Sequence, residues 1–181
     1  MLLTGIDDSK IIQNIEHDKK MTGFDINSIY GQFGWSSLMI AVYYDRKELA
    51  RYLLSDPSIN VYHRTNRGET ALHFCHQISI LKLLLDIRVF DVNIQNNLGD
   101  TGLHRFCRFE HKELARELLL DTRVNVHIRN NYGKIALDYA LEQGCLDIAK
   151  IIENSRHTTL LRIPNRALLH DIVRMIIEEY T

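Results

Sequence analysis

The sequence predicts an all-α solenoid, in which helix–turn–helix units stack in a row and hairpin-like loops join them. The first observation is a glycine that recurs at intervals of 34, 31 and 34 residues, at Gly34, Gly68, Gly99 and Gly133. The second is a pair of leucines that closes each of the first three units, at 53–54, 84–85 and 119–120. Self-similarity at such a period is typical of stacked repeats that share one continuous core.

The composition argues against several classes of partner. Hydrophobic residues make up 45% and charged residues 25% of the 181 residues, and the formal net charge is -1. Because phosphate binding needs an excess of Lys and Arg, we expect no nucleic-acid partner. The apolar runs are short and the N-terminus has no cationic region, so we expect neither a membrane partner nor a signal peptide. Three cysteines are too few for a disulfide framework and indicate a reducing, cytoplasmic location.

Residues 1–31 are predicted to form a degenerate N-terminal capping unit. Asp8 or Ser9 is positioned to cap a helix that carries Ile11, Ile12 and Ile15. Terminal units of a solenoid are expected to be atypical, because one of their faces meets water.

The regular repeats are predicted to occupy residues 32–154, as units at about 32–65, 66–96, 97–130 and 131–154. The glycine of each unit adopts positive φ at little cost, which lets the chain turn before a first helix. Ser36, Thr70 and Thr101 are positioned to accept a backbone N–H of that helix. The second helix carries an apolar stripe that one hairpin cannot bury alone, so neighbouring units must cover it.

The second unit is shorter than its neighbours. We align it with four residues lost between Cys75 and Leu83 and one residue gained near Phe90. Four residues are close to one helical turn, so the apolar face stays in phase. We therefore expect a shortened helix pair, or a shortened turn between its helices, in an unbroken stack.

Residues 155–181 are predicted to form a C-terminal capping helix. After Pro164, six apolar residues keep helical spacing: Leu168, Leu169, Ile172, Val173, Ile176 and Ile177. The alternative is that this helix docks onto a partner.

The recurring motifs carry a family resemblance. Residues 68–73 read Gly-Glu-Thr-Ala-Leu-His, and residues 99–104 read Gly-Asp-Thr-Gly-Leu-His. The closing signature reads Asp-Val-Asn at 91–93. This pattern resembles the ankyrin repeat, whose unit is a turn followed by two helices, and the resemblance covers about residues 24–154. It implies a protein-binding scaffold or adaptor without catalytic residues, which is not an enzyme and needs no cofactor.

The resemblance also implies that His73 and His104 tie neighbouring units together through backbone hydrogen bonds. Some positions depart from the family pattern. The proline that usually follows the threonine is absent from every unit, and the last unit has Ile135 for the threonine and Asp138 for the histidine.

Ankyrin stacks are known to hold their partners with the loop tips and the concave face of the first helices. Carried over to this sequence, the tip positions, which we expect to be exposed, are Phe33, Trp35, Arg67, Glu69, Leu98, Asp100, Tyr132 and Lys134. The inner-helix positions are Tyr43, Tyr44, Arg108 and Phe109. Because interface anchors favour large aromatic residues, we expect the hot spot at Trp35, Tyr43 and Tyr44. The alternative is that some of these aromatics pack under the degenerate first unit.

Two other functions are alternatives to the scaffold. One is a pathogen effector or inhibitor that occupies a host protein with the same surface; in either case we expect a monomer. The other is a metal protein or enzyme, because His73, Cys75 and His76 lie close in sequence, as do His104, Cys107 and His111. Zinc needs about four convergent ligands, and the family gives the first histidine of each group a structural role, so we predict no metal site.

Asn93 and His127 are candidates for hydroxylation. Leu85 precedes Asn93 by eight residues, and Leu119 precedes His127 by the same spacing. This context resembles that in which asparaginyl hydroxylases modify ankyrin repeats. The alternative is that Asn93 only bonds backbone atoms across its own turn.

Overall fold

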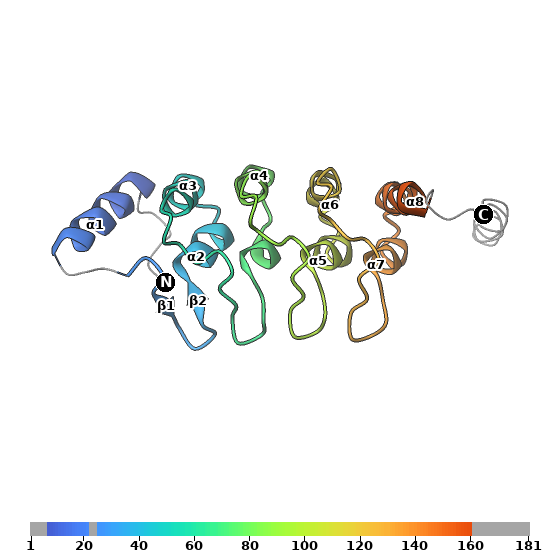
Figure 1. Cartoon of the computed structure of the whole chain (residues 1–181), viewed down its shortest axis with the longest axis horizontal. Coiled ribbons are helices and arrows are strands. Elements are labelled where there is room, and N and C mark those ends of the chain that lie inside the picture. The colour runs from blue at the N-terminus through green and yellow to red at the C-terminus, as the bar shows by residue number, and fades with distance from the viewer. Residues whose placement is uncertain (1–6, 22–24, 161–181) are drawn as a thin grey trace.

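The computed structural model describes residues 7–21 and 25–160. Within these ranges two helical layers form a straight row (Figure 1). The inner layer comprises α2 (Ser37–Tyr43), the 3-10 helix η1 (Ala71–Phe74), α5 (Gly102–Arg108) and α7 (Ala136–Glu142). The outer layer comprises α1 (Asp8–Met21), α3 (Lys47–Ser55), α4 (Ile78–Leu85), α6 (Lys112–Leu118) and α8 (Leu146–Leu160). The predicted helical solenoid is confirmed.

The loops between the units all project from the inner layer on the same side (Figure 1). The first loop contains a short antiparallel pair, β1 (Ile29–Tyr30) and β2 (Trp35–Ser36), in which Tyr30 lies opposite Trp35. We call the segments around Gly34, Gly68, Gly99 and Gly133 the tips; each of these glycines has a φ between 71° and 77°.

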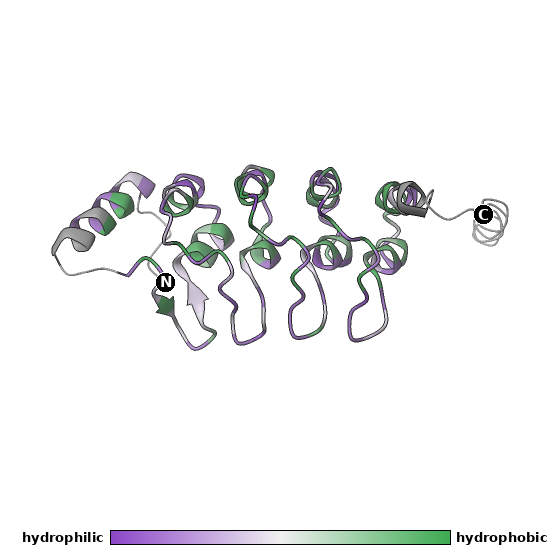
Figure 2. Ribbon diagram, in the orientation of Figure 1, coloured by the Kyte–Doolittle hydropathy of each residue, from purple (hydrophilic) through white to green (hydrophobic). Residues whose placement is uncertain are grey.

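One apolar seam runs along the whole row. Leu53, Leu84, Leu118 and Ile152 occupy equivalent positions of the outer helices and are all fully buried. Hydrophobic residues follow the facing sides of the two layers, and hydrophilic residues dominate the loops (Figure 2). Each unit is thus stabilised by its neighbours, as a stack of repeats requires.

Buried histidines join consecutive units, as the family resemblance implied. In the second unit, Nδ1 of His73 accepts the N–H of Thr70 (3.1 Å), so its Nε2 carries the proton and donates to the carbonyl of Asp100 (2.9 Å). Burial lowers the pKa of His73 to about 4, which keeps the ring neutral. His104 makes the same pair of bonds, to Thr101 and to the carbonyl of Lys134.

The tips form a hydrogen-bonded ladder that the sequence analysis did not anticipate. Asn66 Nδ2 donates to the carbonyl of Gln32 (2.8 Å), Asn97 Nδ2 to that of Asn66 (2.9 Å), and Asn131 Nδ2 to that of Asn97 (2.9 Å). The backbone N–H groups of the same asparagines also donate to the preceding tip. The tips are therefore one connected surface.

The second unit lacks three residues, not four, and they fall in its inner helix: α4 begins ten residues after Gly68, whereas α3 and α6 begin thirteen residues after Gly34 and Gly99. The expected gain of a residue near Phe90 was therefore wrong, because the spacing from Leu84 to Val92 equals that from Leu53 to Val61.

The inner helix of the second unit is a single 3-10 turn that ends at Phe74, whereas α2, α5 and α7 have seven residues each. Cys75 and Gln77 are extended and lead directly into α4. The stack is unbroken, as expected, but one helix of the inner layer is shortened.

At the ends, α1 begins at Asp8 and packs against α3. Helix α8 continues to Leu160, past the boundary predicted at residue 154. The helix predicted after Pro164 lies outside the described residues.

Candidate functional site

The residue before each tip glycine points outward. Phe33 and Tyr132 are 50% and 65% exposed, and Leu98 is similarly exposed. At the remaining tip the guanidinium of Arg67 lies 5.9 Å from the centre of the Phe33 ring. We call these four residues the tip row. They present a cation and three large apolar side chains on the hydrogen-bonded ladder.

The residue after the glycine is not exposed, and this expectation was wrong for Glu69 and Asp100. They are 8% and 2% exposed, because each carboxylate meets a hydrogen-bond donor about one repeat further along the chain. Glu69 accepts a hydrogen bond from Arg105 (2.8 Å), and Asp100 accepts one from Asn130 (2.6 Å). Both carboxylates thus accept hydrogen bonds from side chains about one repeat further along the chain.

Trp35 and Lys134 occupy the same position in their tips, and each is half-buried. Trp35 packs against Phe74 with ring centres 4.4 Å apart. Lys134 donates to Glu142 (2.5 Å), and its ammonium lies 5.1 Å from the centre of the Tyr139 ring. These two side chains mainly support their neighbours.

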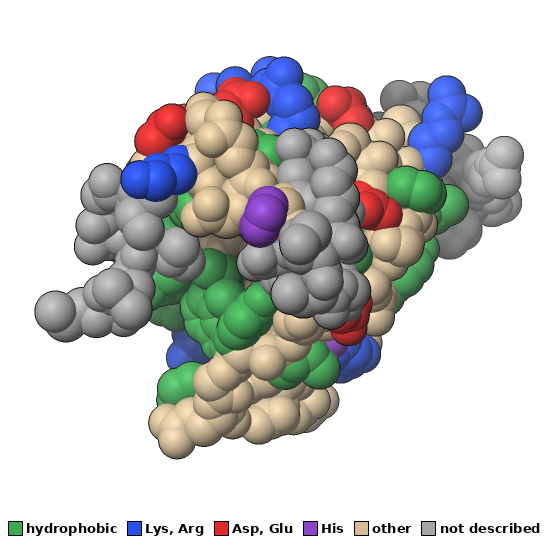
Figure 3. Space-filling model, turned by 90° about the vertical axis from the view of Figure 1, so that its left-hand side faces the viewer, with side chains coloured by type: hydrophobic (Ala, Val, Ile, Leu, Met, Phe, Trp, Pro, Cys, Tyr) green, Lys and Arg blue, Asp and Glu red, His purple; other side chains and the backbone are tan. Residues whose placement is uncertain are grey.

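The structure brings the predicted aromatic hot spot together. Tyr43 meets Trp35 and Tyr44 edge to face, with ring centres 5.0 and 5.1 Å apart. Tyr43 and Tyr44 are each about half exposed. We call these three residues the aromatic cluster; the Trp35 ring packs against Tyr43, which in turn packs against Tyr44. Seen from the α1 end of the row, charged side chains gather over the outer layer and exposed hydrophobic side chains lie below them (Figure 3).

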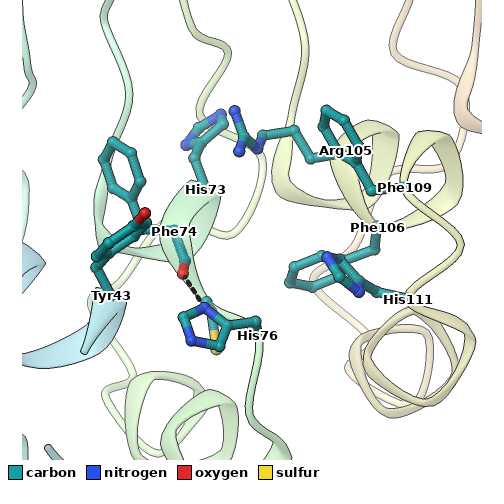
Figure 4. A pocket seen from close by; sticks show the side chains of 9 residues that line it. Tyr43, His73, Phe74, His76, Arg105, Phe106, Phe109 and His111 are labelled. Atoms are coloured by element: carbon teal, nitrogen blue, oxygen red, sulfur yellow. Dashed lines mark hydrogen bonds between the residues drawn. The ribbon is translucent and has the colours of Figure 1, made fainter. Parts of the chain in front are cut away.

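A groove opens beside the aromatic cluster, where the inner helix of the second unit is short. Its volume is about 680 Å³, and its lining is Tyr43, His73, Phe74, Cys75, His76, Arg105, Phe106, Phe109 and His111. Figure 4 shows Tyr43 and His76 on one side and Phe106, Phe109 and His111 on the other. We call this feature the inner-face groove. It exists because the chain leaves the inner layer after Phe74, three residues before the seven-residue helices end.

Arg105 dominates the electrostatics of the inner-face groove. Its guanidinium lies 6.0 Å from the centre of the Phe74 ring and 5.3 Å from that of Phe109, while Nη1 donates to Glu69. Burial, His76 and Arg105 together lower the pKa of His111. An anion in the groove would favour the charged form of His111.

Sequence analysis missed Arg105 as a surface residue and considered His76 and His111 only as metal ligands. Of its inner-helix candidates, Phe109 lines the groove, while Arg108 lies over the rings of Phe109 and Tyr139. The deletion in the second unit was the signal that pointed to the groove, since a shortened helix must leave space or have it filled by neighbours.

The chemistry of the described residues fits a surface better than a catalytic centre. Among the side chains described, no group of three or more His, Cys, Asp or Glu is arranged to hold a metal ion. Burial raises the pKa values of Cys75 and Cys107 to about 12, so both stay protonated and are poor nucleophiles. In the same part of the chain, no helix has the length and apolar character needed to cross a membrane.

Asn93 bridges to the next unit rather than bonding only within its own turn. Its Nδ2 donates to the carbonyl of Arg123 (2.8 Å), and its Oδ1 accepts the N–H of Asn125 (2.8 Å). Asn27 makes the equivalent pair of bonds two repeats earlier. His127 is exposed. Hydroxylation of Asn93 or His127 stays a prediction.

Stacked two-helix units with projecting, cross-linked tips define a helical-repeat protein. The sequence matches the family profile of ankyrin repeats (3 copies) over residues 9–90 and 74–159. The chain belongs to the ankyrin-repeat family.

Curated relatives share this region. A putative ankyrin repeat protein of Acanthamoeba polyphaga mimivirus is 28% identical over 146 residues, which cover 76% of this chain and 18% of the relative. The SMC5-SMC6 complex localization factor protein 1 of Homo sapiens is 32% identical over 108 residues, which cover 58% of this chain and 10% of the relative. The chain thus spans less than a fifth of the length of either relative.

Proposed function

We propose that this protein is a non-catalytic scaffold or adaptor that binds a partner protein through the tip row and the inner-helix face. Ankyrin repeats are generally protein–protein interaction modules. The observation that carries the proposal is the exposure of large apolar side chains on connected, well-packed elements: Phe33, Leu98 and Tyr132 on the tips, and Tyr43, Tyr44 and Phe109 on the inner helices.

These side chains have the properties of interface anchors. Aromatic residues and Arg are enriched at the centres of interfaces, and Lys and Glu are depleted. The Asn ladder holds the tips in register, so little ordering entropy is lost when a partner binds.

Affinity capture from cell lysate followed by titration of the captured partner tests this proposal. We expect Tyr44→Ala and Tyr132→Ala to weaken binding about tenfold each, or ~1.4 kcal/mol. Leu120→Ala is the matched control, because Leu120 is 73% exposed at the end of an outer helix. Equal binding by all three variants would show that the partner uses another surface.

An effector or inhibitor that occupies a host protein is the second candidate function, favoured by the similarity to a viral ankyrin protein. The stoichiometry of the captured complex separates the two functions. An adaptor binds two partners at once and forms a ternary complex, whereas an inhibitor forms a binary complex in which the partner loses its own activity.

A cytoplasmic location and a monomeric state are also part of the proposal. The three cysteines are free and buried, which suits a reducing compartment. Cell fractionation tests the location, and sedimentation equilibrium tests the monomer.

A further inference from the structure

The inner-face groove has apolar walls and a cationic rim. The rings of Phe74 and Phe106 are buried in its wall, and those of Tyr43 and Phe109 are exposed beside it. Across this apolar surface, His76 approaches from the second unit, and Arg105 and His111 from the third (Figure 4). The groove is thus lined by residues of three consecutive units, and the short helix η1 of the middle unit leaves its space open.

No acidic side chain is among the lining residues of the groove. The acids that act on the lining from nearby are Glu69, which bonds Arg105, Asp100 near His73, Asp45 near Cys75, and Glu113 near His111. A guanidinium has five N–H donors, and the bond to Glu69 uses one of them. Because the guanidinium packs over Phe74 and Phe109, its remaining donors are held in place for an incoming anion.

We propose that the inner-face groove takes an acidic segment of the partner protein, in which an aromatic or branched aliphatic side chain stands next to an Asp or Glu. This inference rests on the proposed function and specifies the partner's chemistry. The apolar side chain contacts Phe74, Phe106 and Tyr43, and the neighbouring carboxylate accepts hydrogen bonds from Arg105 and from His76 or His111. The segment needs both the apolar side chain and the carboxylate, because the walls of the groove are apolar and its rim is cationic.

Binding of such a segment is linked to protons. In the free protein, burial, His76 and Arg105 disfavour the charged form of His111, and Glu113 favours it. A bound carboxylate stabilises the charged form and raises the pKa of His111, so the complex binds more protons than the free protein. Affinity therefore increases as the pH falls through the raised pKa of His111.

A random linear peptide library displayed on phage, selected against the full chain, tests the proposal. We expect the selected peptides to carry an apolar residue beside Asp or Glu. Titrations of the fluorescein-labelled peptides should then show about tenfold weaker binding to His76→Glu and to His111→Glu, because a like charge now faces the carboxylate. Both histidines are exposed, so both variants should fold, which thermal unfolding verifies.

His17→Glu is the matched control, because His17 is exposed on α1, which packs against α3 at the end of the row. It makes the same charge change and should bind the peptides like the wild type. Selected peptides without an acidic residue, no selected peptide at all, or binding that both groove variants leave unchanged would each overturn the proposal.

Other occupants give different results. If the wild type is a dimer that His111→Glu dissociates, the groove is an interface between two copies and the proposal is wrong. If the peptides instead lose affinity for Phe33→Ala and Tyr132→Ala, the groove is not the site, but the proposed function stands on the tip row.

Discussion

At the scale of single residues, the buried histidines of the stack make stability depend on pH. His73 is neutral and 2% exposed in the folded protein, and both of its ring nitrogens are hydrogen-bonded. Its pKa falls from 6.5 to about 4 because burial disfavours the charged ring. Between these values the unfolded chain binds more protons than the folded one, so stability rises with pH in this window.

We predict that the wild type loses at most about 3 kcal/mol from this histidine when the pH falls from 6.5 to 4. His73→Gln should flatten this part of the pH profile, since an amide does not titrate there. Urea unfolding at several pH values measures the slope. His17→Gln, at an exposed position, should leave the profile unchanged. A profile as steep in His73→Gln as in the wild type would contradict this assignment.

At the scale of elements, the tip loops are equivalent in backbone shape but not in their surroundings. Gly99 and Gly133 have φ values of 77° and 76°. A Cβ on Gly99 would lie 2.7 Å from the backbone nitrogen of Asn131, whereas a Cβ on Gly133 would meet nothing within 4 Å among the described residues.

We predict that Gly133→Ala costs about 1 kcal/mol, the penalty of a side chain at positive φ. Gly99→Ala should cost about 1–3 kcal/mol more, because the methyl group forces the next tip away and breaks a rung of the Asn ladder. Chemical denaturation of the two variants gives the difference. Equal losses would mean that the ladder does not hold the tips in the folded protein.

The inner helices differ in length, and the short helix η1 leaves the space that forms the inner-face groove. We predict that inserting three residues between Cys75 and His76 extends η1 from four residues to the seven of α5 and fills the inner-face groove. The variant should keep a cooperative unfolding transition and gain helical circular dichroism, while losing the groove-selected peptides. Continued peptide binding would show that the groove lies elsewhere.

At the scale of the whole molecule, the solenoid could be predicted from the sequence because the repeat fixes both the helix pairs and the burial of their apolar faces. Leu53 and Leu84 show this, since each opens its predicted leucine pair and is buried. In the third unit the buried equivalent is Leu118, one residue before the predicted pair at 119–120, and Leu120 is exposed. The aromatic cluster could also be predicted, because its members lie within one unit.

The Asn ladder, the burial of Glu69 and Asp100, and the inner-face groove could not be predicted in the same way. Each depends on a contact between units about 30 residues apart, such as Arg105 with Glu69 or Asn130 with Asp100. The deletion in the second unit showed that a turn was lost, but only the packing of the units shows that the space stays open.

The Asn ladder is directional: every rung donates from one tip to the tip before it. Within the described residues, the ladder ends at the fourth tip, where a Cβ on Gly133 would meet no atom within 4 Å. A transplanted unit that supplies one asparagine could join there and repeat the same geometry. Further repeats can therefore be added in the same direction by engineering, which lengthens the stack without changing the units already present.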